Sequence, residues 1–190
     1  NRIDYVQLDL NNSLSIKKFM KNKKIINKKF DAIIFLSGII EGKNIDQYEE
    51  KSIKRVMNIN FIGFAMLFKM LKKNLSTKAR IVILSSISAD RGSYDPIYAA
   101  SKGALISFMK SLSHWMGKNV RINCVAPGLI KDSNMFLQMS KTRQKYHKND
   151  SLTREITKIE DLSKIILDII QPHWQNMNGA VIRVNGGAYL

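Results

Sequence analysis

The chain has 190 residues, of which 45% are hydrophobic and 24% are charged. This is ordinary globular composition, and it excludes a disordered chain, a collagen-like repeat and a disulfide scaffold. One domain over residues 1–190 is expected at this length. Cys124 is the one cysteine and the three histidines are scattered, so we expect no disulfide and no metal site. No apolar run reaches the roughly 18–20 residues of a membrane span, and no signal peptide is recognisable, which predicts a cytoplasmic protein.

The net charge is +16, with 31 Lys and Arg against 15 Asp and Glu. The densest group of lysines lies between Ser13 and Phe30, a segment without an acidic residue. Such a balance raises the hypothesis of an RNA partner or an anionic membrane surface. A solvated helix face is the commoner explanation, because net charge governs solubility and non-specific binding rather than fold.

Five short apolar segments, in chain order, have the character of strands. The middle ones are continuous apolar runs, which is typical of strands buried on both faces. The five segments are Tyr5–Leu10, Ala32–Leu36, Arg80–Ser85, Val120–Val125 and Val181–Val184.

Segments with helical periodicity separate these strands. One covers residues 14–26, behind the cap signal Asn11-Asn12-Ser13. Longer helices are expected from about Asp46 to Leu75 and from Tyr98 to Met116, and another lies around residues 162–169. Residues 129–153 are polar, basic and irregular in pattern.

The alternation of strands and helices predicts an α/β fold, a three-layer doubly wound parallel sheet of the Rossmann type. Ligands bind such sheets beyond the carboxyl ends of the strands. Polar or glycine-containing segments follow the predicted strands at Asp9, Ser37-Gly38, Ser85-Ser86 and Pro127-Gly128. We therefore expect the functional site at this edge of the sheet.

Tyr98 and Lys102 are one turn apart on a predicted helix and project from the same face. An ammonium near a phenol favours the phenolate and lowers the tyrosine pKa from about 10. A tyrosine tuned in this way can exchange a proton with a substrate oxygen. Taken alone, the pair is a weak signal, and an ordinary helix pair with its lysine in solvent is the better explanation.

Three further features accompany this pair. Ser86 closes the preceding strand, and its hydroxyl can hydrogen-bond the same substrate oxygen. Asn60 lies inside an otherwise apolar helix, where it either holds a water or satisfies local backbone. Pro127-Gly128 fixes an abrupt turn at a strand exit.

Together these residues resemble the short-chain dehydrogenase/reductase family, in the family's order and over essentially all 190 residues. The resemblance implies that Ser86, Tyr98, Lys102 and Asn60 are catalytic. It also implies NAD or NADP as the cofactor, with Asp9 at the adenine and Ile130 near the nicotinamide amide. The cofactor-binding residues implied are Asp9, Leu10, Ser37, Gly38, Tyr98, Lys102, Pro127, Gly128 and Ile130.

The sequence departs from the family at its front. The family begins with a strand, a Gly-rich turn and a helix that hold the cofactor pyrophosphate, and no Gly-rich turn precedes Asp9. We therefore expect the first βα unit and the second strand to be missing from the chain, which leaves NAD or NADP open. Leu36-Ser37-Gly38 stands where the family has Asn-Ala-Gly, and Asp132 displaces the usual Thr after Pro-Gly.

The resemblance implies hydride transfer between a nicotinamide and a carbonyl or alcohol carbon. Tyr98 would be the acid/base, Ser86 would polarise the substrate oxygen, and Lys102 would hold the nicotinamide ribose and keep Tyr98 acidic. Asn60 would order a water. Arg91 and Tyr94 are candidate substrate contacts together with Ser86.

Residues 129–153 are expected to form a basic lid over the site. Such a lid suits an anionic substrate: a nucleotide-linked sugar, a phosphorylated compound or a carrier-bound 3-oxoacyl group. A solvated lid in a generally basic protein is the simpler explanation, since surface charge alone rarely identifies a ligand.

Apolar residues on the two long predicted helices exceed what one sheet face covers, which predicts a homodimer or homotetramer paired through these helices. Three other functions stay open. They are a truncated, non-catalytic partner protein of the same family, a basic RNA-binding protein, and an epimerase or dehydratase acting on a nucleotide sugar.

Overall fold

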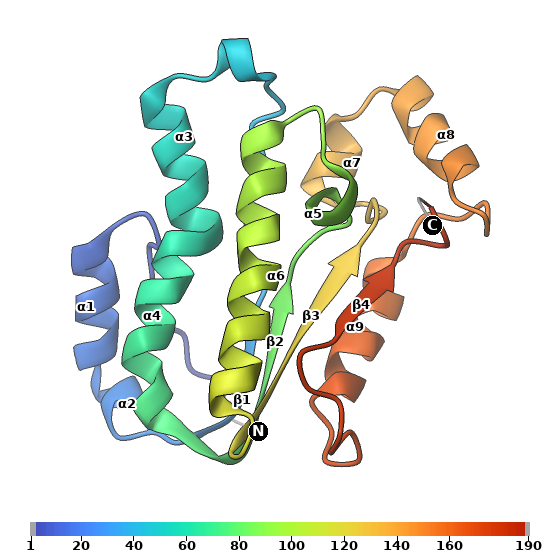
Figure 1. The fold of residues 1–190 in the computed structure, drawn as a ribbon. Coiled ribbons are helices and arrows are strands. Elements are labelled where there is room, and N and C mark those ends of the chain that lie inside the picture. Colours follow the sequence, from blue (N-terminus) through green and yellow to red (C-terminus); the bar gives the residue numbers. More distant parts are fainter. Residues whose placement is uncertain (1–2, 189–190) are drawn as a thin grey trace.

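The structure, a computed structural model, describes residues 3–188. One sheet runs through its centre, with strands in the order β1-β2-β3-β4 and every pairing parallel (Figure 1). The strands are β1 (Phe30–Phe35), β2 (Leu75–Leu84), β3 (Val120–Pro127) and β4 (Val181–Val184). This confirms the α/β, Rossmann-type fold and four of the five predicted strands.

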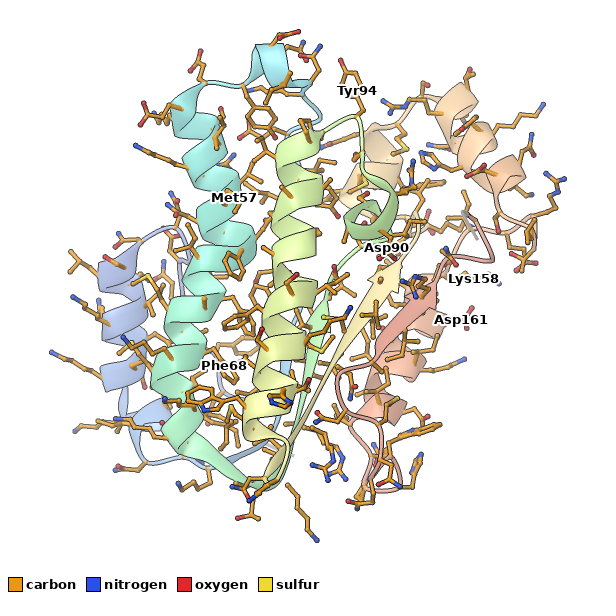
Figure 2. All side chains as sticks on the ribbon, in the orientation of Figure 1. Met57, Phe68, Asp90, Tyr94, Lys158 and Asp161 are labelled. Carbon is orange, nitrogen blue, oxygen red and sulfur yellow. The ribbon has the colours of Figure 1, made fainter. Side chains whose placement is uncertain are left out.

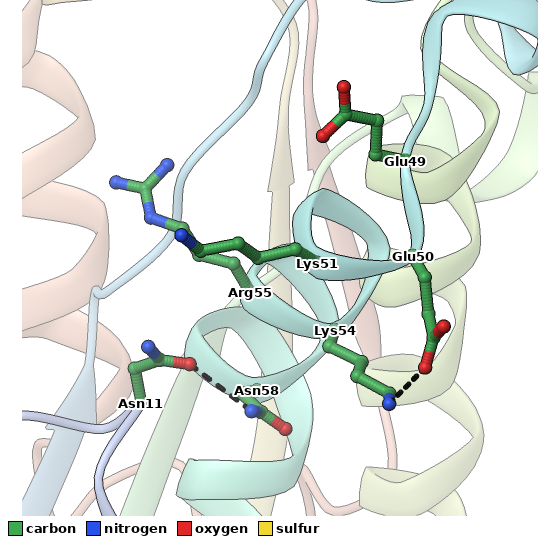
Figure 3. Close-up of a pocket in the computed structure, with 7 residues that line it drawn as sticks. All are labelled: Asn11, Glu49, Glu50, Lys51, Lys54, Arg55 and Asn58. Atoms are coloured by element: carbon green, nitrogen blue, oxygen red, sulfur yellow. Dashed lines mark hydrogen bonds and ion pairs between the residues drawn. The ribbon is translucent and has the colours of Figure 1, made fainter.

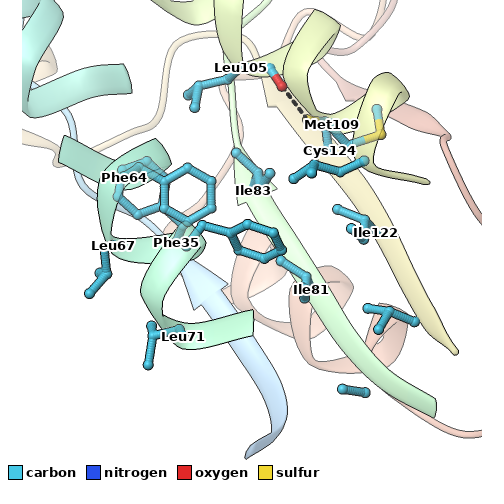
Figure 4. Close-up of a cluster of buried hydrophobic side chains, with 14 of the residues drawn as sticks. Phe35, Phe64, Leu67, Leu71, Ile81, Ile83, Leu105, Met109, Ile122 and Cys124 are labelled. Carbon is cyan, nitrogen blue, oxygen red and sulfur yellow. Dashed lines mark hydrogen bonds between the residues drawn. The ribbon is translucent and has the colours of Figure 1, made fainter. Parts of the chain in front are cut away.

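Helices cover both faces of the sheet. Successive residues of each strand point to opposite sides, so each strand places apolar side chains under the helices of both layers. Ile81 and Ile83 of β2 face the larger core, under α1 (Ser13–Lys21), α4 (Gly63–Leu71) and α6 (Pro96–Met116) (Figures 1 and 4). Val82 faces the smaller core under α9 (Ile159–Ile169). The expected three layers are therefore present.

The prediction of a strand at Tyr5–Leu10 is wrong. The segment is irregular, and it makes no ladder within the described residues. Strands are stabilised by pairing, and alternation alone provides none. Val6 and Leu8 instead pack against the larger core, and Leu10 is buried.

Gly63 explains how this segment fits against the helices. A Cβ at this position would lie 2.3 Å from the Leu10 carbonyl oxygen and 2.8 Å from that of Asn58. Both neighbours are backbone atoms, so the close approach of the two segments requires glycine.

The helix expected from Asp46 to Leu75 is divided into several parts. It consists of a 3-10 turn (Ile45–Gln47), α3 (Glu50–Met57), a π-helical turn (Asn58–Ile62) and α4, and a second 3-10 turn (Lys72–Asn74) leads into β2. Leu75 itself belongs to the strand. The π turn contains Asn60, whose side chain bonds backbone of another segment, and such turns are frequent at functional sites.

The remaining helices are short. The helix expected over residues 14–26 divides at Asn22 into α1 and α2 (Lys23–Ile26). Residues 129–153 contain α7 (Asn134–Gln138) and α8 (Lys141–Asp150), so their irregular pattern conceals two helices, each begun by a serine N-cap. None of the helices in residues 3–188 has both the length and the apolar character needed to cross a bilayer.

Candidate active site

The candidate catalytic residues lie where the carboxyl ends of β2 and β3 meet the start of α6. Tyr98 and Lys102 occupy the first two turns of α6, and their exposed fractions are 8% and 3%. Ser86 follows β2 by two residues and is 9% exposed. The arrangement places a phenol, an ammonium and a hydroxyl at the edge where open α/β sheets bind ligands.

Lys102 reaches back to the end of β2. Its Nζ donates to the Leu84 carbonyl at 2.9 Å and lies 5.9 Å from the centre of the Tyr98 ring. Burial lowers the pKa of Lys102 to about 8, an effect partly offset by Cys124. At neutral pH the ammonium is therefore mostly charged but easily deprotonated.

The pKa of Tyr98 moves opposite to the expected direction. Burial raises it, the hydrogen bond with Ser86 lowers it, and the charge of Asp95 raises it. The Lys102 ammonium is directed to the Leu84 carbonyl instead of the phenol. Tyr98 is consequently protonated at neutral pH, which is the form that can give a proton to a carbonyl oxygen.

The two serines after β2 have different surroundings. Ser85 is buried and donates to the Lys102 carbonyl at 2.9 Å, which holds α6 against the strand. Ser86 Oγ accepts from the Ser88 N–H at 3.1 Å, and the Ser86 side chain lowers the pKa of Tyr98. Of the two serines, Ser86 is the one that acts on the phenol of Tyr98.

Asn60 links three segments around the site. Its Oδ1 accepts from the Ile39 N–H at 2.8 Å, and its Nδ2 donates to the Ile39 carbonyl and to Ser101 Oγ at 2.9 and 2.8 Å. Ser101 in turn donates to the Tyr98 carbonyl at 2.7 Å. The sequence left two roles open for Asn60, holding a water or hydrogen-bonding backbone groups. These contacts support the second role.

Ser37 and Gly38 are exposed after the end of β1, and Gly38 lies beside the buried ammonium of Lys102. A Cβ on Gly38 would lie 2.9 Å from Lys102 Nζ, so glycine leaves room for the lysine at this edge. After β3, the Gly128 N–H donates to the Val184 carbonyl at 3.0 Å, which holds this turn against the end of β4. Pro127 is buried, and Ile130 packs in the smaller core beside its bridge to Thr157.

Asp9 and Leu10 lie just before α1, where the Leu10 carbonyl oxygen closely approaches Gly63. The Asp9 carboxylate accepts from the Asn11 N–H at 2.9 Å. Asn11 and Asn58 line a charged cavity of about 680 Å³ with residues of the first turns of α3 (Figure 3). The remaining lining residues are Glu49, Glu50, Lys51, Lys54 and Arg55. Ser86, Tyr98 and Lys102 do not line it.

Arg91 and Tyr94 lie on the segment between β2 and α6. Tyr94 is 58% exposed before α6 (Figure 2), and Arg91 ends α5 (Ser88–Arg91). Burial, followed by the charges of Arg91 and Arg143, lowers the pKa of His147 in α8. Arg91 is thus within electrostatic range of α8.

Asp95 is a site residue that the sequence analysis missed. It is 1% exposed, it caps α6 by accepting from the Tyr98 N–H at 2.9 Å, and it accepts from the Gly42 N–H at 2.9 Å. It also accepts from the Glu41 N–H at 3.2 Å and from the Tyr48 hydroxyl at 2.8 Å. Asp95 therefore fixes the loop after β1 to the helix that carries Tyr98 and Lys102.

Replacement of Asp95 by asparagine should destabilise the protein. The amide offers one acceptor oxygen where the carboxylate serves four donors, so N–H groups lose their partners and the loss is about 3 kcal/mol. Chemical denaturation at neutral pH measures it, with the exposed Asp46→Asn as the matched control. Equal stability of Asp95→Asn and Asp46→Asn would contradict this role.

The site fits a nicotinamide cofactor. An ammonium has three N–H donors, and among the described residues Lys102 gives one of them to Leu84. The others are available to ligand hydroxyls, and Gly38 keeps the adjoining edge open. The residues that would hold the group are Lys102, Ser37, Gly38, Gly128 and Asp9.

Comparison with known proteins identifies related sequences over nearly the whole length of the chain. The profile of a family described as enoyl-(acyl carrier protein) reductase matches residues 1–189. The 3-oxoacyl-[acyl-carrier-protein] reductase of Buchnera aphidicola subsp. Baizongia pistaciae is 30% identical over 192 residues, covering 97% of this chain and 77% of that protein.

Solved structures share the fold. A short-chain dehydrogenase/reductase from Brucella melitensis, described as a glucose/ribitol dehydrogenase, matches with a TM-score of 0.88 at 26% identity. The match covers 97% of this chain and 76% of that one. A short chain dehydrogenase from Burkholderia cenocepacia in complex with NADP has a TM-score of 0.86 at 21% identity, with the same coverage.

Proposed function

The chain belongs to the short-chain dehydrogenase/reductase family, and from this premise we propose that it reduces a 3-oxoacyl group carried as a thioester on acyl carrier protein. Members of the family are oxidoreductases that act on carbonyl or alcohol groups with NAD or NADP. The observation that carries the proposal is the convergence of Ser86, protonated Tyr98 and buried Lys102 at the strand ends. The similar Buchnera reductase supports the substrate class.

The chain's own residues would act on the substrate oxygen. When bound, a reduced nicotinamide would supply the hydride that the carbonyl carbon takes up. The Tyr98 hydroxyl would give its proton to the oxygen, which carries the developing negative charge. The Ser86 hydroxyl would donate a hydrogen bond to the same oxygen, and the Lys102 ammonium would stabilise the phenolate that remains.

Asn60 and Asp95 would act as positioning residues. Asn60 holds Ile39 and, through Ser101, the first turn of α6. Asp95 holds Gly42 and the Tyr98 N–H. Both fix the loop after β1 relative to Tyr98, and such fixed geometry is what proton transfer to a substrate oxygen requires.

Two of the three alternatives receive less support. Two lysines of the 13–30 segment have partners within the protein: Lys24 pairs with Asp4 at 3.0 Å and Lys29 donates to the Lys73 carbonyl at 2.9 Å. An RNA-binding role does not explain why Ser86, Tyr98 and Lys102 lie together. A non-catalytic partner protein has no need of a buried ammonium, which is costly to keep. The cytoplasmic location stays a prediction.

An assay of substrate preference tests the proposal. We expect NADH or NADPH to be oxidised when a 3-oxoacyl thioester is added, because Tyr98 is protonated and faces Ser86. Loss of nicotinamide absorbance measures the rate, and a 4-keto nucleotide sugar serves as the competing substrate class. Turnover of the sugar without turnover of the thioester would contradict the proposed substrate.

Assembly through α4 and α6 also belongs to the proposal. Few apolar residues of these two helices are exposed, so the exposed apolar surface is smaller than expected. Ile62 and Met66 remain 41% and 37% exposed, Trp115 is 69% exposed, and all three lie in or beside these helices. A second copy would cover them across a two-fold axis.

Charge placed on this face should separate the copies. Met66→Glu is expected to shift the protein from a homodimer or homotetramer to smaller species in light scattering at micromolar concentration. Leu14→Glu, at a 70% exposed residue of α1, is the matched control and should assemble normally. A monomeric wild-type protein with full activity would overturn the assembly.

A further inference from the structure

A second cavity, of about 430 Å³, lies within residues 131–158 (the lysine pocket). Its lining combines five lysines with two apolar side chains, one amide and one acid. These are Lys131, Lys141, Lys145, Lys148, Lys158, Phe136, Ile156, Gln144 and Glu155. Lys141, Lys145 and Lys148 come from α8 at helical spacing, so they share one face of that helix.

The charge of this cavity is unbalanced. Five lysines against one glutamate leave four positive charges on the lining residues. Among the described residues none of the five lysines forms an ion pair. Like charges one turn apart destabilise a helix, so α8 on its own is disfavoured by this arrangement. An anion in the cavity would remove the repulsion.

The cavity lies at the edge of the sheet that also carries the candidate active site. Lys131 follows Ile130, which leaves β3 at the same edge of the sheet as Ser86 and bridges to Thr157. On its other side, α8 carries His147 within range of Arg91. The lysine pocket is thus formed by residues 131–158, the segment that follows the end of β3.

We propose that the lysine pocket binds a phosphate ester of a ligand that is bound at the active site. A phosphate offers several acceptor oxygens to converging ammonium groups, and charge-assisted hydrogen bonds of this kind are the strong ones. Phe136 and Ile156 give the pocket an apolar wall for the adjoining carbon chain. The phosphate comes from the substrate's pantetheine arm or from the cofactor; only the former source rests on the proposed function.

Direct binding tests this without relying on turnover. The protein is titrated calorimetrically with pantetheine 4′-phosphate, with pantetheine, and with NADPH. Charge reversal at two pocket lysines, Lys145→Glu with Lys148→Glu, should weaken binding of the phosphorylated probe at least about tenfold. Lys17→Glu with Lys18→Glu, at exposed α1 lysines, makes the same charge change elsewhere and should leave binding unchanged.

The probes separate the two sources. Weaker binding of pantetheine 4′-phosphate alone assigns the pocket to the substrate, whereas weaker binding of NADPH alone assigns it to the cofactor. Glu155→Gln removes the one acid of the lining and should tighten binding of the affected probe. Unchanged binding of both phosphorylated probes in the pocket variant, with unchanged thermal unfolding, would overturn the site. Because these titrations need no reaction, absence of reductase activity would count against the proposed function alone.

Discussion

The Tyr98→Phe variant should lose turnover while keeping the fold. Proton transfer by a positioned side chain contributes roughly 10²–10⁴-fold to a rate, so we expect kcat to fall at least about a hundredfold. The ring stays in its buried place, and the hydroxyl's contact is with Ser86, so little packing is lost. Steady-state rates measure the effect, and circular dichroism verifies the fold.

A second tyrosine supplies the control. Tyr5 is 85% exposed, and Tyr5→Phe removes the same hydroxyl from a residue outside the site. Its activity should equal that of the wild type. Undiminished carbonyl reduction by Tyr98→Phe would refute the role assigned to this tyrosine.

Lys102→Met should gain stability and lose activity. Burial lowers the pKa of Lys102 from 10.5 to about 8, which corresponds to about 3 kcal/mol of unfavourable charge burial at neutral pH. Methionine removes this cost but also the hydrogen bond to Leu84, which is worth about 1 kcal/mol. We therefore expect the free energy of unfolding to rise by about 2 kcal/mol at pH 7, with kcat/KM reduced at least about a hundredfold.

The pH dependence identifies the group responsible. Between pH 8 and 10.5 the unfolded lysine binds a proton and the folded one does not, so wild-type stability gains a contribution as pH rises through this window. Lys102→Met lacks that contribution, and its stability advantage should shrink from pH 8 upward. Cys124, whose pKa burial raises to about 12, works in the opposite direction above pH 9 in both proteins. A stability difference that stays constant across the window would contradict the assignment.

Much of the fold could be predicted from local pattern because the sheet is buried on both faces. Ile81, Val82 and Ile83 form a continuous apolar run, and alternate residues of it enter the two cores. Tyr5–Leu10 shows the limit of this reasoning, since alternation does not reveal whether a partner strand is present. The π turn around Asn60 was not predicted, for a related reason. Hydrophobic periodicity averages over a whole helix and cannot locate one extra residue in a single turn.

Part of the site could be predicted from the sequence because its motif residues are close together along the chain. Tyr98 and Lys102 lie four residues apart on a helix, and Ser86 follows the preceding strand. Asp95 could have been found as a cap, since Asp before Pro at a helix start is a recognised signal. Its bonds to Glu41 and Tyr48 span 54 and 47 residues and could not be foreseen. The direction of the Tyr98 pKa needed burial and neighbouring charges, which local sequence does not supply.

A crystal structure of the protein with NADP and a 3-oxoacyl thioester analogue would test the central claim most directly. The account predicts that the analogue's carbonyl oxygen lies within about 2.6–3.2 Å of both Tyr98 Oη and Ser86 Oγ. It also predicts that Lys102 Nζ contacts the cofactor while keeping its bond to the Leu84 carbonyl. An analogue bound with its carbonyl away from Tyr98 and Ser86 would contradict the account.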